Sequence, residues 1–359
     1  MELKSENKVF GLLCIMVMAL FVVVLIANHN LAQAKDKPIV WQAQSAYGSG
    51  LSYFKHAQYF ADRVKQMSNG RLIIQVNTGG SLVPKHTEQD AVAKGSLDMS
   101  LSTSMYIRGK FPESVLLGNS AYDMKAQEFI AWLEYGGGYE LWQEMYDNKK
   151  WNVKVLPAYC FYCTESLGWF RKPIRTLDDF KGMKFRTVGE WGEVLQGLGA
   201  SVVTLPGGEL YSALEKGVLD GTDMSHPAFD KGLGLYEICK FNLYPGVHQV
   251  SGPMETLVRP ELWEALPKDL QQIVIAAARE ATLRSITQTV IEDAAAVEFF
   301  RTKGVKIIKL SPETLAVIHK KFNEVYDKRA AKYPFYKKVL NSQKAFHKKW
   351  HKYDQLQSW

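Results

Sequence analysis

Strand-like and helix-like segments alternate along this chain in two separate stretches, and this alternation restricts the fold more than any other feature does. In the first stretch, strand patterns at residues 39–47 and 71–77 flank an amphipathic helix pattern at 51–67, whose apolar residues recur at three-to-four spacing. A short helix pattern at 88–94 then precedes another strand pattern at 97–103. Such alternation predicts an α/β lobe built on a largely parallel sheet.

The same alternation returns further along the chain. Strand patterns at 183–187 and 201–205 are each followed by a helix pattern, at 190–198 and 209–216, and residues 219–224 are typical of a further short strand. At 359 residues the chain is long enough to form two lobes. The predicted fold class is therefore α/β, with the α/β pattern repeated in a second lobe.

The rest of the chain connects and covers these lobes. A strand pattern at 153–162 leads toward the second lobe, and residues 269–300 form a long amphipathic helical run. The tail predicts a basic helix with an apolar stripe, which either packs on its own chain or meets a partner subunit. The predicted divisions are a first lobe at 35–158 with part of 250–310 returning to it, a second lobe at 159–249, a lobe-spanning helix with closing elements at 250–332, and a C-terminal helix at 333–359.

The N-terminus has the pattern of a secretory signal peptide. Lys4 and Lys8 accompany a nearly unbroken apolar run from Val9 to Ala27, and Ala32-Gln33-Ala34 is a small-x-small cleavage site. Cleavage after Ala34 is the favoured interpretation of residues 1–34. The run approaches the length of a membrane span, so an uncleaved anchor is the alternative.

Three cysteines follow the N-terminal segment. Cys160 and Cys163 form a C-x-x-C pair within a strand pattern, whereas redox pairs favour a helix N-terminus. Residues three apart on a strand point to opposite faces, so these two cannot easily bridge each other. Buried thiols are the simplest interpretation, and a disulfide from one of them to Cys239 is the alternative in an oxidising compartment.

Positive charge is concentrated at the C-terminus. The net charge is +7, and residues 319–359 alone hold eleven Lys or Arg against three Asp or Glu. No nucleic-acid motif accompanies this excess, so it indicates a solvated helix face and not a nucleic-acid partner.

Four sequence pieces lie in a characteristic order between residues 184 and 221. They are Lys184-Phe185-Arg186-Thr187, Leu198-Gly199-Ala200-Ser201-Val202, Leu205-Pro206-Gly207-Gly208-Glu209-Leu210-Tyr211 and Ala213-Leu214-x-x-Gly217-x-x-Asp220-Gly221. In this order and spacing, the pieces resemble the solute-binding subunit of a tripartite ATP-independent periplasmic (TRAP) transporter. The resemblance covers essentially the whole chain after the N-terminal segment.

Within that family, the chain is most similar to the branch that binds 2-oxo monocarboxylates and lactate. The Gly168-Trp169-Phe170 step and the aromatic C-terminal helix carry this closer likeness. The resemblance implies a two-lobe periplasmic-binding-protein fold with a hinge, a long lobe-spanning helix and an added C-terminal helix that builds a homodimer. It also implies a periplasmic location, delivery of the solute to TRAP membrane subunits, and a solute carboxylate bound jointly by an arginine and a metal ion.

Arg186 is the leading candidate for binding that carboxylate. It follows a short strand, and its planar guanidinium can form two parallel hydrogen bonds with a carboxylate while remaining charged. The alternative is a structural ion pair with Asp178 or Asp179.

The resemblance places the remaining ligands by position. It assigns the metal to Glu165, Asp223, the Met224 carbonyl and Gln249, with Glu165, Met224 and Gln249 also near the solute. The branch usually has an amide where this chain has Glu165, a carboxylate where it has Gln249, and an aromatic residue where it has Met224. Oxygen donors of this kind favour calcium or sodium over zinc.

Further candidates come from the ends of the first-lobe strands and from the Gly-Trp step. In open α/β sheets ligands sit beyond the carboxyl ends of the strands. This rule points to Ser45, Tyr47, Ser104 and Tyr106, and Trp169 is a candidate wall of the pocket.

Two functional classes account for these residues. The first is a periplasmic binding protein that closes around a small carboxylate without making or breaking a bond, either for uptake or as a ligand sensor. The second is a secreted metal-dependent enzyme in which Glu165 or Asp223 is a general base. No Ser/His/Asp or Cys/His set is apparent in the sequence, and no phosphate-binding P-loop is present.

Overall fold

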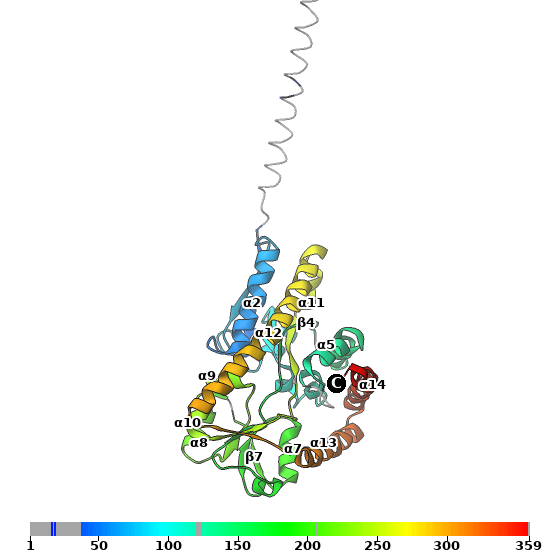
Figure 1. Ribbon diagram of the computed structural model, residues 1–359. Coiled ribbons are helices and arrows are strands. Elements are labelled where there is room, and N and C mark those ends of the chain that lie inside the picture. Colours follow the sequence, from blue (N-terminus) through cyan, green and yellow to red (C-terminus); the bar gives the residue numbers. More distant parts are fainter. Residues whose placement is uncertain (1–15, 17, 19–36, 120–123, 206, 358–359) are drawn as a thin grey trace, which may run out of the picture.

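The computed structural model describes residues 16, 18, 37–119, 124–205 and 207–357, which form two lobes around one sheet each (Figure 1). All but two residues of the predicted signal peptide lie outside the described residues, as does Pro206 of the motif at 205–211. Within the described ranges, no helix is both long enough and apolar enough to cross a bilayer.

The first lobe is built on a five-stranded sheet in the order β2-β1-β3-β10-β4. Its strands are β1 (Ile39–Ser45), β2 (Leu72–Asn77), β3 (Met99–Ser102), β4 (Lys154–Tyr162) and β10 (Gly252–Val258). The β1 strand pairs in parallel with β2 and β3, whereas β10 runs antiparallel between β3 and β4. The helical elements of this lobe are α2 (Ser52–Met67), α3 (Glu88–Ala93), η1 (Ser104–Ile107), α4 (Ser114–Gly118), α5 (Ala126–Tyr135) and α6 (Gly138–Asp147).

The second lobe is built on a six-stranded sheet in the order β11-β9-β5-β8-β6-β7. Its strands are β5 (Gly168–Phe170), β6 (Lys184–Arg186), β7 (Ser201–Val203), β8 (Gly221–Thr222), β9 (Phe241–Tyr244) and β11 (Lys306–Lys309). The β5 strand is antiparallel to both of its neighbours, and the other pairs are parallel. Its helical elements are η2 (Leu177–Phe180), α7 (Glu190–Gly197), η3 (Gly207–Glu209), α8 (Leu210–Glu215), α9 (Pro227–Gly232) and α10 (Leu235–Ile238).

The α/β fold class and the two-lobe architecture predicted from the sequence are confirmed. The prediction of largely parallel sheets needs one qualification, because each sheet contains a single reversed strand. Those strands, β5 and β10, lie where the chain has just crossed from one lobe to the other. In a βαβ unit the crossover helix returns the chain so that the next strand is parallel to the first. A strand that enters from the other lobe has no such crossover, so it can run antiparallel to its neighbours.

One long helix joins the lobes. After the short α11 (Pro260–Glu264), α12 (Lys268–Thr302) runs for 35 residues, about 50 Å at the α-helical rise. It packs against β4 and α2 in the first lobe and against α9 in the second (Figure 1). The predicted helix at 269–300 is confirmed.

The helix predicted at 126–146 is interrupted by its glycines. The α5 helix ends at Tyr135, and α6 begins at Gly138. Gly137 has φ +83°, and a Cβ on Gly136 would lie 2.7 Å from the Trp132 side chain. The glycines therefore allow a tight corner at which the backbone approaches the indole.

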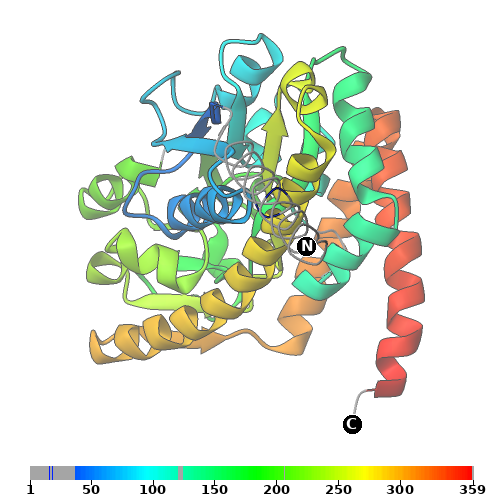
Figure 2. The ribbon, with the colours of Figure 1, turned by 90° about the horizontal axis from the view of Figure 1, so that it is seen from above.

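The C-terminal helix packs first on its own chain. After α13 (Pro312–Lys332), α14 (Pro334–Gln357) lies along α4, α5, α6 and α13 (Figure 2). Tyr336, Val339 and Leu340 are buried there, whereas Tyr353 and Leu356 near its end are 64% and 81% exposed. The apolar stripe is thus covered along its first half and uncovered at its end.

The described cysteines are free thiols. Cys160 and Cys239 lie in two different buried clusters, so the alternative of a disulfide between them is not realised. Burial raises the pKa of both thiols above their usual value, which makes them unreactive at neutral pH.

The first-lobe core contains a buried carboxyl group with a measurable effect on stability. Glu255 on β10 is 1% exposed, and its Oε1 accepts hydrogen bonds from Trp142 Nε1 (2.8 Å) and the Tyr146 hydroxyl (2.5 Å). Its Oε2 has no hydrogen-bond partner in the described chain. Burial raises the Glu255 pKa from 4.5 to about 7.

Replacing Glu255 with glutamine is therefore expected to stabilise the fold at high pH. Because the folded-state pKa lies above the unfolded one, the contribution of Glu255 to stability is fully present below pH 4.5 and is lost as pH rises through 7. At pH 8, Glu255→Gln should gain about 3 kcal/mol of unfolding free energy, and at pH 4 the gain should vanish. Urea unfolding at both pH values, with the exposed Glu264→Gln as the control, checks this; an equal effect at both would contradict it.

Candidate functional site

A cavity of about 410 Å³ lies between the two lobes. First-lobe residues after β1, before α3 and in η1 line one side of it, and second-lobe residues after β6, β7 and β8 line the other. Four of the candidate residues lie in this lining: Arg186, Met224, Tyr47 and Tyr106. A larger hollow of about 700 Å³ opens between α2, α9 and α12, but none of the predicted site residues lines it.

Arg186 is the last residue of β6, and the ends of the neighbouring strands fix its guanidinium. Its Nε donates to the Leu205 carbonyl and its Nη1 to the Asp223 carbonyl, both at 2.9 Å. Nη1 also lies 3.7 Å from Asp223 Oδ1. No hydrogen bond within the described chain uses Nη2, and the residue is only 6% exposed. Two of the three guanidinium nitrogens are therefore held in place, while the N–H groups of Nη2 remain available to a ligand in the cavity.

Two buried carboxylates lie behind the arginine. Asp223 is 3% exposed and follows β8, and Glu165, in the turn between β4 and β5, is 1% exposed. Asp223 Oδ2 accepts a hydrogen bond from the Thr187 hydroxyl at 2.7 Å, whereas its Oδ1 has no hydrogen-bond partner in the described chain. Burial raises the pKa of Glu165 well above its usual value, and the nearby charge of Asp223 raises it further.

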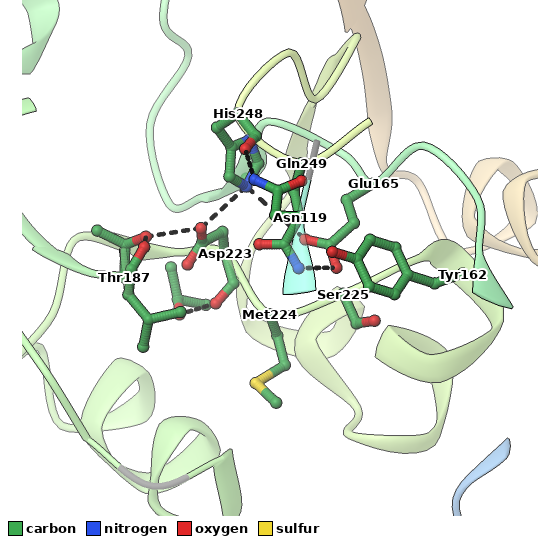
Figure 3. A network of polar contacts seen from close by, with 12 residues as sticks. Asn119, Tyr162, Glu165, Thr187, Asp223, Met224, Ser225, His248 and Gln249 are labelled. Atoms are coloured by element: carbon green, nitrogen blue, oxygen red, sulfur yellow. Dashed lines mark hydrogen bonds and ion pairs between the residues drawn. The ribbon is translucent and has the colours of Figure 1, made fainter. Parts of the chain in front are cut away.

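Gln249 contacts Glu165 directly. Its Nε2 donates to Glu165 Oε1 at 2.9 Å, and its backbone carbonyl accepts from the Glu165 amide at 3.1 Å (Figure 3). Relative to the pattern expected of the branch, this chain has the acid at Glu165 and the amide at Gln249 exchanged. Because the two side chains are in contact, the site still contains one acid and one amide after the exchange.

His248 lies at the centre of this group, although no role was predicted for it from the sequence. Its Nε2 is 3.0 Å from Asp223 Oδ2 and 3.7 Å from Glu165 Oε2 (Figure 3). The ring stacks on Trp191, and its carbonyl accepts a hydrogen bond from Asn119 Nδ2 at 2.7 Å. The available signal was its position directly before Gln249; nothing in the sequence pointed to Asn119.

Met224 lies on the cavity side of the same group. Its Sδ is 3.6 Å from Arg186 Nη1, and its side chain forms part of the cavity wall. The carbonyl that Arg186 binds is that of Asp223, one residue earlier, so the structure records no protein contact for the Met224 carbonyl.

Several predicted residues do not line the cavity: Glu165, Asp223 and Gln249 lie behind Arg186, and Ser104 and Trp169 lie within the protein. Ser104 is fully buried and donates to the Ser114 carbonyl at 2.8 Å. Trp169 is also fully buried, donates from Nε1 to Asp230 at 2.7 Å and packs edge-on against Phe300. The polar atoms of Ser104 and Trp169 thus already have partners inside the protein, and contact of these two residues with the solute stays a prediction.

Hydrogen bonds tie α2 of the first lobe to the segment that follows Met224. The Tyr53 hydroxyl lies 2.6 Å from Ser225 Oγ, and Ser52 Oγ lies 3.3 Å from His226 Nε2. His226 Nδ1 in turn lies 2.7 Å from Asp293 Oδ1 on α12. The structure thus assembles a Ser-His-Asp array that the sequence did not reveal, because its members come from three distant elements.

The oxygen atoms near Arg186 fit a hard cation. Calcium and sodium prefer carboxylate, amide and carbonyl oxygens, and the unpartnered Asp223 Oδ1 is a buried donor of this kind. No group of three or more His, Cys, Asp or Glu side chains in the described ranges is arranged to hold a metal. A cation bound by Glu165 and Asp223 would therefore complete its ligands with the Gln249 amide and a backbone carbonyl, a set unsuited to zinc.

A protein-family model described as "bacterial extracellular solute-binding protein, family 7" matches residues 44–333. The chain belongs to this family. Among the similar proteins of this family is the monocarboxylate 2-oxoacid-binding periplasmic protein of Nostoc sp. PCC 7120, which is 32% identical over 332 residues, covering 92% of this chain and 90% of the relative.

Solved structures of other solute-binding proteins agree with this membership. A TRAP solute-binding protein from Pseudoalteromonas atlantica T6c, with bound sodium and pyruvate, matches with a TM-score of 0.82 and 30% identity, covering 90% of this chain and 100% of that one. One from Bordetella bronchiseptica RB50, a mixed-occupancy dimer with calcium and picolinate, matches with a TM-score of 0.83 and 26% identity, covering 89% and 95%. The resemblance predicted from the sequence is confirmed: this is a TRAP-type family 7 solute-binding protein.

Proposed function

We propose that this family 7 solute-binding protein captures a small 2-oxo or 2-hydroxy acid in the periplasm and delivers it to the membrane subunits of a TRAP transporter. The observation that carries the proposal is the unused Nη2 group of the Arg186 guanidinium, held at the wall of the interlobe cavity. A carboxylate there can accept a charge-assisted hydrogen bond from a donor that needs no rearrangement. The relatives that bind 2-oxo acids support this choice of solute class.

A cation is part of the proposed site. Arg186 supplies one positive charge, whereas Glu165 and Asp223 supply two negative charges when both are ionised. An incoming carboxylate would then meet a net negative group, which is unfavourable at this depth. A calcium ion bound by Glu165, Asp223, the Met224 carbonyl and Gln249 reverses that sign, and a sodium ion bound there neutralises it. Its role is to bind and orient the solute together with Arg186.

The positions of the possible catalytic residues favour binding over catalysis. A second candidate, hydrolysis, rests on the Ser52-His226-Asp293 array. His226 is fully buried and none of these residues lines the cavity at Arg186. The array therefore serves in this proposal to hold α2 against the second lobe, and the chain is not an enzyme.

The proposal also covers export, lobe movement and assembly. Residues 1–34 act as a signal peptide. The lobes at 35–158 and 159–249 are the mobile parts, residues 250–332 connect them, and residues 333–359 form the C-terminal helix. The uncovered end of α14, with Tyr353 and Leu356, is proposed to contribute to a homodimer. The dimer of the Bordetella relative supports this assembly.

Calorimetric titration of residues 35–359 with a panel of small 2-oxo and 2-hydroxy acids tests the proposed function. We expect saturable one-to-one binding of at least one acid, with the acid recovered unchanged when the mixture is followed by NMR. Conversion of the bound acid would support the enzyme instead, and failure of the whole panel in a folded, ligand-free sample would overturn the solute class.

The contact between Glu165 and Gln249 predicts a compensating pair of substitutions. Glu165→Gln alone should weaken cation-dependent binding by about 10-fold or more, because it removes one of two acids near the cation. The double change Glu165→Gln with Gln249→Glu should recover most of the affinity, since it returns an acid across a 2.9 Å contact. Titration of the four proteins of this cycle measures the coupling; additive losses would show that the two positions are not equivalent.

A further inference from the structure

The interlobe cavity is lined by cations beyond the arginine already described. Arg108 and Lys85 enter the lining from the first lobe, opposite Arg186 in the second, and none of the lining residues described is Asp or Glu. A small carboxylate bound at Arg186 and the proposed cation needs none of these additional charges. The excess positive charge on the first-lobe wall is therefore unexplained by the proposed function alone.

The Arg108 side chain has no partner among the described residues. Arg108 follows η1 and is partly buried, and its guanidinium makes no hydrogen bond or ion pair with any residue that the structure describes. Burial lowers the pKa of its guanidinium below the usual range, which shows that the surroundings disfavour its charge. The acid whose charge acts on it, Glu190, is committed elsewhere: it accepts from the Tyr336 hydroxyl at 3.2 Å and lies 3.9 Å from Arg329.

A partly buried guanidinium without a counter-charge is costly, and five N–H donors in a fixed plane are well suited to a carboxylate or phosphate. The two arginines of the cavity differ in this respect. Arg186 is held by two backbone carbonyls, whereas Arg108 is held by nothing and faces the same space. An anionic group on the solute would supply the missing partner.

The cavity also has room for such a group. Its volume of about 410 Å³ lies within the range of roughly 300–1,000 Å³ typical of pockets for drug-sized ligands. Part of the wall is the flexible, unbranched side chain of Met224. A three-carbon acid would leave much of this volume to water.

We infer that the solute of this protein carries a second anionic group, which Arg108 binds from the first lobe while Arg186 binds the first carboxylate from the second. The inference rests on the proposed function and narrows the solute to acids with two anionic ends. It also makes Arg108 the residue that distinguishes this solute from a monocarboxylate. Because the two arginines belong to different lobes, such a solute bridges the lobes directly.

Two five-carbon acids of equal length provide the test. In titrations of residues 35–359 with calcium, 2-oxoglutarate is expected to bind about 10- to 100-fold more tightly than 2-oxopentanoate, the effect of one hydrogen bond to a charged group. Arg108→Gln should remove this difference and leave 2-oxopentanoate within about 3-fold of its native affinity. Lys94→Gln, the same charge change at an exposed first-lobe residue outside the cavity, should leave the difference intact.

The outcomes separate this inference from the proposed function. Equal affinities for the two acids in the native chain, or a preference for 2-oxopentanoate, would overturn the second anionic group while leaving the binding protein in place. A preference for 2-oxoglutarate that survives Arg108→Gln would remove Arg108 from its role. Failure of both acids to bind would count against the proposed function and this inference together.

Discussion

Replacing Arg186 with alanine is expected to lower solute affinity by at least about 100-fold, the effect of removing one partner of a buried, hydrogen-bonded charge pair. The reason is geometric as well as electrostatic. The Leu205 and Asp223 carbonyls hold Nε and Nη1 of the guanidinium, so Nη2 is presented to the cavity in a fixed orientation. Calorimetric titration of the variant with the best native ligand measures the loss.

Arg186→Lys serves as the matched control, because it keeps the charge and loses the planar fork. It should retain some affinity and bind less tightly than the native chain. Thermal unfolding of both variants separates loss of the ligand contact from loss of the fold, since Arg186 also joins the ends of β7 and β8. Native affinity in a folded Arg186→Ala protein would remove this residue from the site.

Complete removal of the cation is expected to have an effect of similar size. Without it, the solute carboxylate keeps only Arg186 as a positive partner, and the charge of Arg186 is already shared with the buried Asp223. Losing one partner of a buried charge pair costs several kcal/mol, so affinity should fall by at least about 100-fold and return when calcium or sodium is restored. Elemental analysis before and after chelation, with titration at each stage, provides the measurement.

Asp223→Asn is the complementary variant. It removes the negative charge beside Arg186 and should make the remaining binding less dependent on the cation, because Arg186 no longer shares its charge with Asp223. Unchanged affinity in native protein shown to be free of metal would contradict the role of the cation.

The order of elements could be predicted because it depends on local patterns. The helix at 51–67 and the strand at 71–77 agree with α2 and β2 to within a residue, since apolar spacing and the Asn69-Gly70 turn define them locally. The reversed strands β5 and β10 could not be predicted in the same way. Their direction is set by pairing with strands far away in the sequence, which leaves no local signal.

The site was predictable where a residue acts from the end of a strand, and less so elsewhere. Arg186 lies where its motif placed it, at the end of β6 and facing the cavity. Trp169 and Ser104 have partners inside the protein, and sequence spacing could not show this, because a residue in a buried sheet or short helix can face either the cavity or the core. His248 and Arg108 owe their importance to neighbours on other elements, so only three-dimensional proximity reveals them.

The hydrogen bonds from α2 to Ser225 and His226 bear on how quickly a captured solute can leave. Any separation of the lobes there must break the Tyr53–Ser225 and Ser52–His226 contacts, which together contribute about 2 kcal/mol. That is a factor on the order of 30 in the ratio of shut to open protein, with or without solute. Part of the preference for the closed form is thus independent of which solute is bound. A membrane partner that separated α2 from the second lobe would favour release of the solute without contacting the bound acid.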